Sequence, residues 1–346
     1  MNAPSAAAVS TVLLGTALGD ALGLPAEGLS RAKIMRRWRG EWRMRLLFGR
    51  GMVSDDTEHS VMVSLSLMEQ PTDAEAFGCA LAWRLRWWFA AVPAATGLAT
   101  ARACVKLWLG ISPEHSGVFS AGNGPAMRSA VIGAFHAYDE GRRRAFVRAS
   151  TRITHTDPRA EIAALAVAEA AAFSVRNGLS IDAVSFVELL ASLSTDEEWN
   201  AIVQKLRHAL EKEDTVDAFA AALGLERAVS GYAYHTVPVA LYAWLRHGAD
   251  FRSALISVLN CGGDTDTLGA ITGGLCVLRS GIDSIPGEWL SRIMDWPLNS
   301  ATLRRLSTAP PRLITGSPWI WPLALLRNLF FLLVVLAHGL RRLLVF

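Results

Sequence analysis

Residues 6–22, with the sequence AAAVSTVLLGTALGDAL, predict a helix with one face that carries almost no side chains. Gly15 and Gly19 lie on this face, and Gly23 continues the four-residue spacing before Leu24-Pro25 stops the helix. Glycine costs backbone entropy, so this stripe indicates a surface where another helix or a ligand comes close to the backbone. The spacing also resembles a membrane dimerisation face, but the acidic residues within and just after the segment do not fit that interpretation.

The composition favours a helical protein with a large core. The 346 residues allow one large domain or two ordinary ones. Hydrophobic residues make up 51% of the chain, alanine-rich stretches are frequent and β-branched runs are few, so helices are expected throughout. The net charge of +3, with both signs mixed along the chain, gives no direct signal for nucleic-acid binding.

Helical patterning continues along most of the chain. After the first helix we predict others at about 55–69, 74–89, 125–140, 158–176, 181–193, 197–210, 216–223, 237–246, 251–259 and 265–279. The sequence contains no alternating strand pattern of useful length, no internal repeat and no low-complexity tract. The prediction is therefore an all-α fold.

The cysteines and the N-terminus favour a cytoplasmic protein. No two cysteines form a C-x-x-C pair, so we expect no structural zinc site. Scattered cysteines in a chain of this size fit a reducing compartment. They are Cys79, Cys104, Cys261 and Cys276. No Lys or Arg precedes Val12, and Asp20 interrupts the apolar run, so the N-terminus does not look like a signal peptide.

An acidic cluster, Ser54-Asp55-Asp56-Thr57-Glu58, opens the helix predicted at 55–69. Helix capping explains part of it, because Ser54 or Asp55 is a good N-cap and Asp55 with Glu58 fits a capping box. Acidic residues in a first turn also suit the helix dipole. By itself, this cluster indicates a helix start.

A second cluster, Gly262-Gly263-Asp264-Thr265-Asp266-Thr267, precedes another apolar helix. Asp264 could be only a cap. Two glycines before two alternating carboxylates are a poor choice for capping alone, however, because glycine is selected where the chain turns tightly or makes room.

Taken together, the two clusters predict a metal site. Apart from Glu58, each offers two carboxylates and two hydroxyls, and neither contains His or Cys. Such all-oxygen sets suit Mg²⁺, Mn²⁺ or Ca²⁺ rather than Zn²⁺. Four carboxylates brought together without a metal would raise each other's pKa, and a pair of ions would remove that repulsion and supply Lewis acidity.

Three further features predict a ligand pocket. Glu27 lies in a loop just after Pro25. Residues 120–125, SAGNGP, form a flexible loop that opens a helix; free backbone N–H groups there could hold phosphate, and a plain helix start explains the pattern equally well. His155 precedes the cap Thr156-Asp157-Pro158 and either packs beside it or faces the pocket.

In this order, the motifs resemble those of the ADP-ribosylglycohydrolase family, which includes the dinitrogenase reductase activating glycohydrolases. The resemblance spans roughly residues 10–295, and the two acidic motifs are its specific part. It implies a single large multi-helix all-α domain with a binuclear Mg²⁺ or Mn²⁺ centre. It also implies removal of ADP-ribose from a modified protein side chain or from a related ADP-ribosyl small molecule. The motifs are Gly15–Asp20–Glu27, Ser54-Asp55-Asp56-Thr57, Gly122-Asn123-Gly124, His155 and Gly262-Gly263-Asp264-Thr265-Asp266-Thr267.

The resemblance implies roles for individual residues. The metal ligands would be Ser54, Asp55, Asp56, Asp264, Asp266 and Thr267. The catalytic residues would be Glu27, Asp56 and Asp266, and ADP-ribose would contact Ser120, Gly122, Asn123, Gly124 and His155. The bond would break through an oxocarbenium-like state with a positioned water, and Glu27 or a metal-bound Asp would assist proton transfer.

Two positions depart from the family pattern. Ser54 stands where Thr is common and keeps the hydroxyl. Arginine-specific bacterial members tend to have an Asp before a Gly in the loop that here reads Pro93-Ala94-Ala95-Thr96-Gly97, and no Asp occurs between Asp73 and Asp139. The linkage to the modified side chain and the general acid/base therefore stay open.

Two other functions remain open at the level of sequence. The chain could be a non-catalytic or regulatory binding module, of the immunity type, that recognises an ADP-ribosylating partner. It could also hydrolyse a different metal-bound small molecule on the same fold. Six oxygen ligands are more than pure binding would need, which favours the hydrolase.

The composition shifts sharply after Pro310-Pro311, so we divide the chain into a catalytic domain, 1–310, and a hydrophobic C-terminal extension, 311–346. A spanning helix needs about 20 apolar residues. Residues 319–340 reach that length, but they contain Arg327.

Three interpretations of the extension remain. It is a helix that lies on a membrane or on the protein's own core, a tail anchor, or a partner-binding helix. We therefore expect a cytoplasmic protein that contacts the membrane surface through 319–346.

Overall fold

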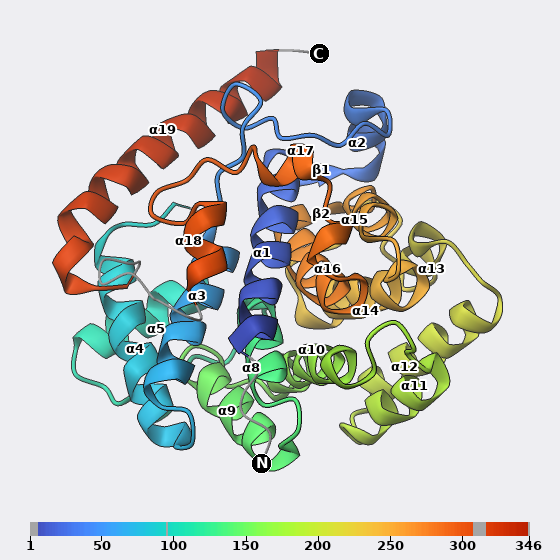
Figure 1. Cartoon of the computed structure of the whole chain (residues 1–346), viewed down its shortest axis with the longest axis horizontal. Coiled ribbons are helices and arrows are strands. Elements are labelled where there is room, and N and C mark those ends of the chain that lie inside the picture. Colours follow the sequence, from blue (N-terminus) through green and yellow to red (C-terminus); the bar gives the residue numbers. More distant parts are fainter. Residues whose placement is uncertain (1–5, 95, 307–315, 345–346) are drawn as a thin grey trace.

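Helix α1 (Ala6–Gly23) lies at the centre of the fold, with helix α16 (Thr265–Ser280) along its side (Figure 1). The computed structural model describes residues 6–94, 96–306 and 316–344. A Cβ atom added to Gly19 would lie 1.9 Å from the carbonyl oxygen of Gly269, and one added to Gly15 would lie 2.2 Å from that of Gly273. The glycine stripe is therefore a helix contact in which the two backbones touch, as the sequence predicted.

The described part of the chain is helical almost throughout, which confirms the predicted all-α class. The remaining α-helices are α2 Arg31–Trp38, α3 Asp55–Glu69, α4 Ala74–Ala90, α5 Leu98–Trp108, α6 Pro113–Ser116, α7 Gly124–Met127, α8 Ser129–Phe135, α9 Glu140–Arg152, α10 Pro158–Asn177, α11 Ala183–Ser192, α12 Glu197–Glu211, α13 Val216–Ala222, α14 Ala233–His247, α15 Phe251–Leu259, α17 Gly287–Leu290, α18 Ser300–Arg305 and α19 Trp321–Leu344. Short 3₁₀ helices occur at Leu24–Ala26, Ile282–Ser284 and Pro318–Ile320.

Two strands of two residues each join the ends of α1 and α16. Strand β1 (Leu29–Ser30) pairs antiparallel with β2 (Gly262–Gly263). Gly263 has φ +87°, and a Cβ atom there would lie 1.9 Å from the carbonyl oxygen of Val229. The glycine pair therefore serves a tight turn and a close approach. Strands of two residues are too short to give an alternating pattern, which is why the sequence did not predict them.

Several helix boundaries differ from the prediction. The helix expected at 125–140 is broken at Arg128 into α7 and α8, and α14 begins at Ala233, before the internal Pro238. Six helices of the described residues were not predicted: α2, α5, α6, α9, α17 and α18. Arg128 is fully buried, and its guanidinium donates hydrogen bonds to the hydroxyls of Ser150 and Thr154. Because these partners are distant in the sequence, the local hydrophobic pattern around Arg128 gives no sign of the helix break.

Helix α19 runs along the outside of the body, and its C-terminal end lies near α2 (Figure 1). The guanidinium of Arg37 in α2 donates a 2.7 Å hydrogen bond to the carbonyl oxygen of Arg342. By length and composition, Pro318–Arg342 could cross a membrane, and 17% of its most apolar window is buried. The segment Ala7–Ala26 passes the same test with 83% buried, so it is a core helix.

The inner side of α19 carries both polar contacts and buried apolar residues such as Phe331, and both place the helix against the protein. The amide nitrogen of Asn328 donates to the carbonyl oxygen of Ala91 at 2.9 Å, and His338 Nε2 lies 3.0 Å from the carbonyl oxygen of Pro25. The inner side of the helix therefore lies on the protein itself, in line with the first of the three interpretations, a helix on a membrane or on the protein's own core. The predicted domain boundary at Pro310-Pro311 falls outside the described residues.

Candidate active site

The sequence motifs converge on one pocket of about 660 Å³. Its wall contains Glu27, Ser54, Asp55, Ser120, Gly122, Asn123, Gly124, His155, Asp264, Asp266 and Thr267. Asp56 is the one predicted site residue that does not line the pocket. It is 1% exposed, and its carboxylate accepts a 3.3 Å hydrogen bond from the hydroxyl of Thr267. The two acidic clusters therefore meet in space.

Asp20 of α1 holds the turn that carries the first cluster. Its carboxylate accepts hydrogen bonds from the backbone N–H of Ser54 at 2.9 Å and from the hydroxyl of Thr57 at 2.5 Å. Burial raises the pKa of Asp20 to about 7. In the sequence, Asp20 interrupts an apolar helix and belongs to the motif Gly15–Asp20–Glu27, and these are the signals that pointed to a role for it.

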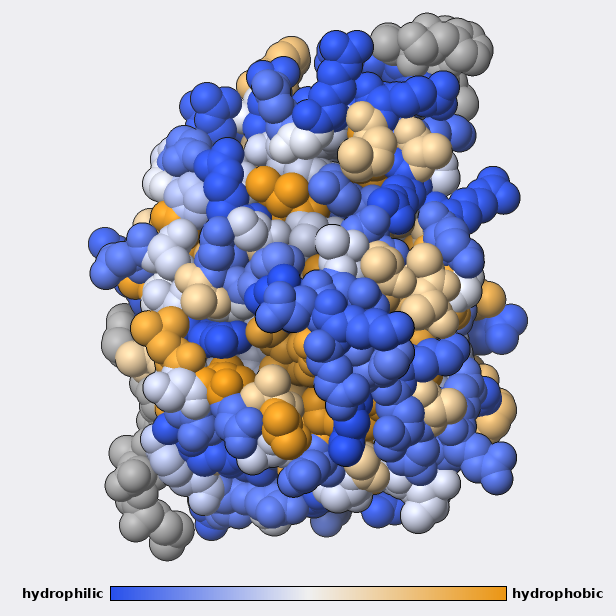
Figure 2. All heavy atoms as spheres, turned by 90° about the vertical axis from the view of Figure 1, so that its right-hand side faces the viewer, coloured by the Kyte–Doolittle hydropathy of each residue, from blue (hydrophilic) through white to orange (hydrophobic). Residues whose placement is uncertain are grey.

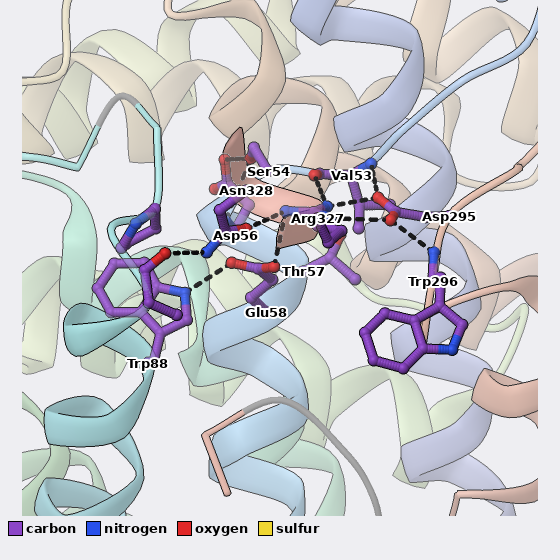
Figure 3. A network of polar contacts seen from close by, with 12 residues as sticks. Val53, Ser54, Asp56, Thr57, Glu58, Trp88, Asp295, Trp296, Arg327 and Asn328 are labelled. Carbon is purple, nitrogen blue, oxygen red and sulfur yellow. Dashed lines mark hydrogen bonds and ion pairs between the residues drawn. The ribbon is translucent and has the colours of Figure 1, made fainter. Parts of the chain in front are cut away.

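The first turn of α3 is capped by Ser54, as predicted. The Ser54 hydroxyl accepts a 3.2 Å bond from the backbone N–H of Asp56 and donates a 3.1 Å bond to the Asp56 carboxylate. The predicted capping box is wrong, because Glu58 turns away from the cap. Its carboxylate accepts a 2.6 Å bond from the indole of Trp88 and lies 3.0 Å from a guanidinium nitrogen of Arg327 (Figure 3).

The second cluster is more than a helix cap. Asp264 occupies the N-cap position of α16, but its side chain forms no capping hydrogen bond. Its carboxylate instead accepts a 2.7 Å bond from the side-chain amide of Asn123, whose nitrogen also donates to the hydroxyl of Thr236 at 2.9 Å. Asn123 thereby fixes the glycine loop against the acidic cluster.

The buried carboxylates are short of partners. Burial, together with neighbouring carboxylates, raises the pKa of Asp55, Asp56 and Asp266 well above the usual value. Oδ1 of Asp56 and Oδ1 of Asp266 are both buried without a hydrogen-bond partner. Buried polar atoms without partners are costly and unusual, and cations of the Mg²⁺ type bind oxygen ligands.

The donor set therefore fits divalent ions, although it does not form a complete cage. In the described ranges, no three side chains of His, Cys, Asp or Glu are placed so that they could hold an ion together as they stand. The hydroxyls of Ser54 and Thr267 lie outside that count, and both already contact Asp56. A metal centre here needs these hydroxyls or rotation of the carboxylates.

Glu27 follows the 3₁₀ turn after α1 and faces the same pocket. Burial, and then the nearby Asp264, raises its pKa, while Arg342 acts in the opposite direction. The guanidinium of Arg342 donates a 2.9 Å hydrogen bond to the Glu27 carbonyl oxygen, and the N–H of Gly28 donates to that of Gly263 at 2.8 Å. The end of α19 and β2 thus both fix the loop that carries this carboxylate.

His155 lies directly under the glycine loop. A Cβ atom on Gly122 would lie 3.1 Å from His155 Nε2, and one on Gly124 would lie 3.1 Å from Cε1. Burial and the nearby Arg128 lower the pKa of His155 to about 3, so its imidazole is neutral near pH 7. Its Nδ1 lies 2.9 Å from the hydroxyl of Thr154, which Arg128 also contacts.

The departure from the family pattern falls on the pocket wall. Ala94 and Gly97 both line the pocket, and Ala95 lies outside the described residues. This loop brings no carboxylate to the site. The other side of the wall includes Phe331 and Val335 of α19, which lie beyond the predicted domain boundary at Pro310-Pro311. The turns of a C-terminal helix carry no motif that would have revealed this contact.

Comparisons with known proteins agree with this fold. The family model described as ADP-ribosylglycohydrolase matches residues 2–316. An uncharacterised protein of Archaeoglobus fulgidus is 34% identical over 290 residues, which cover 82% of this chain and 90% of that protein. The ADP-ribosyl-[dinitrogen reductase] glycohydrolase of Rhodospirillum rubrum is 28% identical over 292 residues, which cover 81% of this chain and 88% of that enzyme.

A solved structure shares the same fold. The ADP-ribosylglycohydrolase-related protein complex contains a chain that superimposes with a TM-score of 0.63 at 25% identity, covering 87% of this chain and 96% of that one. The helical fold and the match along most of the sequence define a glycohydrolase of the ADP-ribosyl class. The chain belongs to the ADP-ribosylglycohydrolase family.

Proposed function

We propose that this protein is a metal-dependent hydrolase that removes ADP-ribose from a modified protein side chain or from a related ADP-ribosyl small molecule. The observation that carries the proposal is the pair of partnerless, buried carboxylate oxygens of Asp56 and Asp266 beside one pocket. Two clusters far apart in the sequence supply them, and a hydroxyl of the second cluster contacts a carboxylate of the first. A surface that only binds a partner gains nothing from this arrangement.

The proposed cofactors are two divalent ions, Mg²⁺ or Mn²⁺. When bound, such ions supply Lewis acidity to ribose hydroxyls and to an attacking water. The side chains that would hold them are Ser54, Asp55, Asp56, Asp264, Asp266 and Thr267. The raised pKa values of the buried carboxylates support this, because a bound cation favours the charged form that burial disfavours.

The chain's own residues would position the substrate and move the proton. Gly122 and Gly124 keep side chains away from His155, which leaves room for a ribose or phosphate group along the loop. The neutral imidazole of His155 can exchange a hydrogen bond with a hydroxyl. Glu27, whose pKa is raised by burial, is placed to carry a proton to or from the scissile bond, with Asp266 as the alternative.

Release of free ADP-ribose is the direct test. Wild-type protein is incubated with arginine-linked, serine-linked and nucleic-acid-linked ADP-ribose, after chelation and after addition of Mn²⁺ or Mg²⁺. Turnover is expected only with metal, and Asp266→Asn should lower the rate roughly 100-fold or more, the scale of removing a key electrostatic group. Asp283→Asn, at an exposed aspartate of the Ile282–Ser284 turn, is the matched control and should keep the wild-type rate.

Metal binding gives a second readout that does not depend on the substrate. Calorimetry should show two ions for the wild type and lost stoichiometry for Asp56→Ala and Asp266→Ala. Unchanged Mn²⁺ and Mg²⁺ binding in both variants would rule out the metal centre. Glu27→Gln should lower the rate of ADP-ribose release as much as Asp266→Asn does if Glu27 is the sole acid/base. It should lower the rate less if a metal-bound Asp can take over the proton transfer.

The family match does not favour the alternative of a non-catalytic module that recognises an ADP-ribosylating partner. If the protein binds metal but cleaves none of the three linkages, the result favours the non-catalytic binding module.

We also propose that the enzyme works in the cytoplasm and contacts the membrane surface through 319–346. The described cysteines are all free, which suits a reducing compartment, and the outer side of α19 is apolar.

A further inference from the structure

The outer face of α19 is a continuous row of large apolar side chains. Leu326 is 63% exposed and Leu333 is 65% exposed, and they lie seven residues apart on one side of the helix. The exposed residues of this face include Leu326, Leu329, Leu333, Leu336 and Leu340. On the face of the molecule at α12 and α13, by contrast, apolar residues are scattered among hydrophilic ones (Figure 2).

A hollow of about 600 Å³ lies at the C-terminal end of this apolar face, where α19 meets α2. Eight arginines line the hollow, and no Asp or Glu of the described residues does. We call it the arginine basin. Its arginines include Arg36 and Arg39 at the end of α2, Arg43 and Arg45 in the loop that follows, and Arg341 and Arg342 in α19.

The arginines in the basin disfavour one another's charge. Burial and the adjacent Arg43 lower the pKa of Arg45, and burial and Arg37 lower that of Arg342. The guanidinium of Arg45 donates hydrogen bonds of 3.4 Å to the carbonyl oxygens of Arg37 and Glu41, and the charge of Glu41 acts in the opposite direction on its pKa. A concentration of one charge is costly in the folded protein and attracts ligands of opposite charge.

We propose that the arginine basin binds the anionic headgroups of a lipid bilayer while the outer face of α19 lies in the bilayer interface. This inference extends the proposed membrane contact of 319–346 by assigning it a charge-selective site. The charge of the basin complements anionic lipid, and the apolar row next to it suits the boundary between headgroups and acyl chains. Free phosphate or nucleic acid would account for the basin and leave the apolar row unexplained.

The polar anchors of α19 favour a helix that lies on the membrane over one that spans it. Arg327 is engaged with Glu58 and Asp295 on the inner side of the helix, so it is held away from lipid. Phe331 and Val335 of the same helix line the candidate active site. Docking through α19 would therefore hold the pocket close to the lipid surface, where a substrate at the membrane would meet it.

Vesicle co-sedimentation of the full-length protein tests the proposal. Wild-type protein should sediment with vesicles of phosphatidylcholine plus phosphatidylglycerol, bind far more weakly to phosphatidylcholine alone, and dissociate as salt is raised. The triple variant Arg36→Gln/Arg43→Gln/Arg341→Gln, at three exposed positions of the basin, should bind anionic vesicles on the order of 100-fold more weakly. The control Arg102→Gln/Arg148→Gln/Arg304→Gln changes the net charge equally at exposed positions elsewhere and should bind like the wild type.

The apolar row has its own variant. Leu326→Gln/Leu333→Gln should weaken binding to anionic vesicles, and Leu109→Gln/Leu179→Gln, at exposed leucines elsewhere, should not. Thermal melting of each variant checks that it is folded.

Several results would overturn the proposal. The first two are equal binding of the wild type to neutral and anionic vesicles, and unchanged vesicle binding by the triple arginine variant. The third is a basin that binds inorganic phosphate or nucleic acid while the protein has no affinity for vesicles. The fourth is a dimer in light scattering that Leu326→Gln/Leu333→Gln dissociates. Release of ADP-ribose from a soluble substrate is measured in parallel. A failure there contradicts the proposed hydrolase and leaves the vesicle result intact.

Discussion

Arg327 of the C-terminal helix lies 3.0 Å from Glu58 in the first turn of α3, the same turn that carries Asp55 and Asp56 (Figure 3). The other side of the guanidinium contacts Asp295 and donates a 2.9 Å hydrogen bond to the carbonyl oxygen of Val53. Burial alone would lower the pKa of Arg327, but Glu58 and Asp295 hold it above its usual value. The hydrophobic extension is therefore joined to the acidic site by a buried charge network.

Replacing Arg327 should destabilise the whole fold. Arg327→Met leaves the buried carboxylates of Glu58 and Asp295 without their cation, which costs about 3–5 kcal/mol when a buried pair is broken on one side. Urea unfolding followed by circular dichroism measures the change. Arg144→Met breaks a more exposed ion pair with Glu140 and should cost less than about 1 kcal/mol. Equal stability of the two variants would show that α19 is not part of the folded core.

Two adjacent phenylalanines separate the inner side of α19 from its outer side. Phe331 is 3% exposed and lines the candidate active site, whereas Phe330 is 50% exposed. Phe331→Ala should cost about 3 kcal/mol of stability, as for other core aromatics, and raise KM by widening the pocket. Phe330→Ala should change neither quantity. Identical KM values for both variants would remove α19 from the active-site wall.

The contact between α1 and α16 should not tolerate a methyl group. In Gly19→Ala the new Cβ would lie 1.9 Å from the Gly269 carbonyl oxygen, so the helices must separate, at a cost of more than about 3 kcal/mol. ADP-ribose hydrolysis should fall too, because α16 opens with Asp264 and Asp266. Gly78→Ala, in the middle of α4, meets only Ala149 at 3.8 Å and should stabilise the protein by roughly 0.5–1 kcal/mol. Thermal denaturation of both variants measures the contrast.

The buried imidazole of His155 should make the protein less stable in acid. Its pKa is about 3 in the folded state against an ordinary 6.5, so between these values the unfolded chain binds more protons. Stability is therefore complete above pH 6.5 and falls as the pH drops toward 3, by at most about 1.4 kcal/mol per pH unit.

The matching experiment compares chemical denaturation at pH 7 and pH 5. His155→Gln should narrow the difference between the two pH values, and His208→Gln, at an exposed position of α12, should leave it unchanged. A His155 variant with the full wild-type pH dependence would contradict a neutral, buried imidazole.

The sequence by itself determined the helical class and the family, and it predicted the acidic residues, the glycine loop and the histidine that meet at the candidate site. Local rules were sufficient for this, because the glycine spacing of α1, the two acidic helix starts and the loop at Gly122 are each readable within a few residues. The tertiary structure decided how these parts combine. Only the packing of α3 beside α16 brings Asp56 within reach of Thr267, and only the network around Arg327 joins the extension to the acidic site. Such contacts join residues far apart in the chain, so they depend on backbone approach and buried charge, and no local periodicity records them.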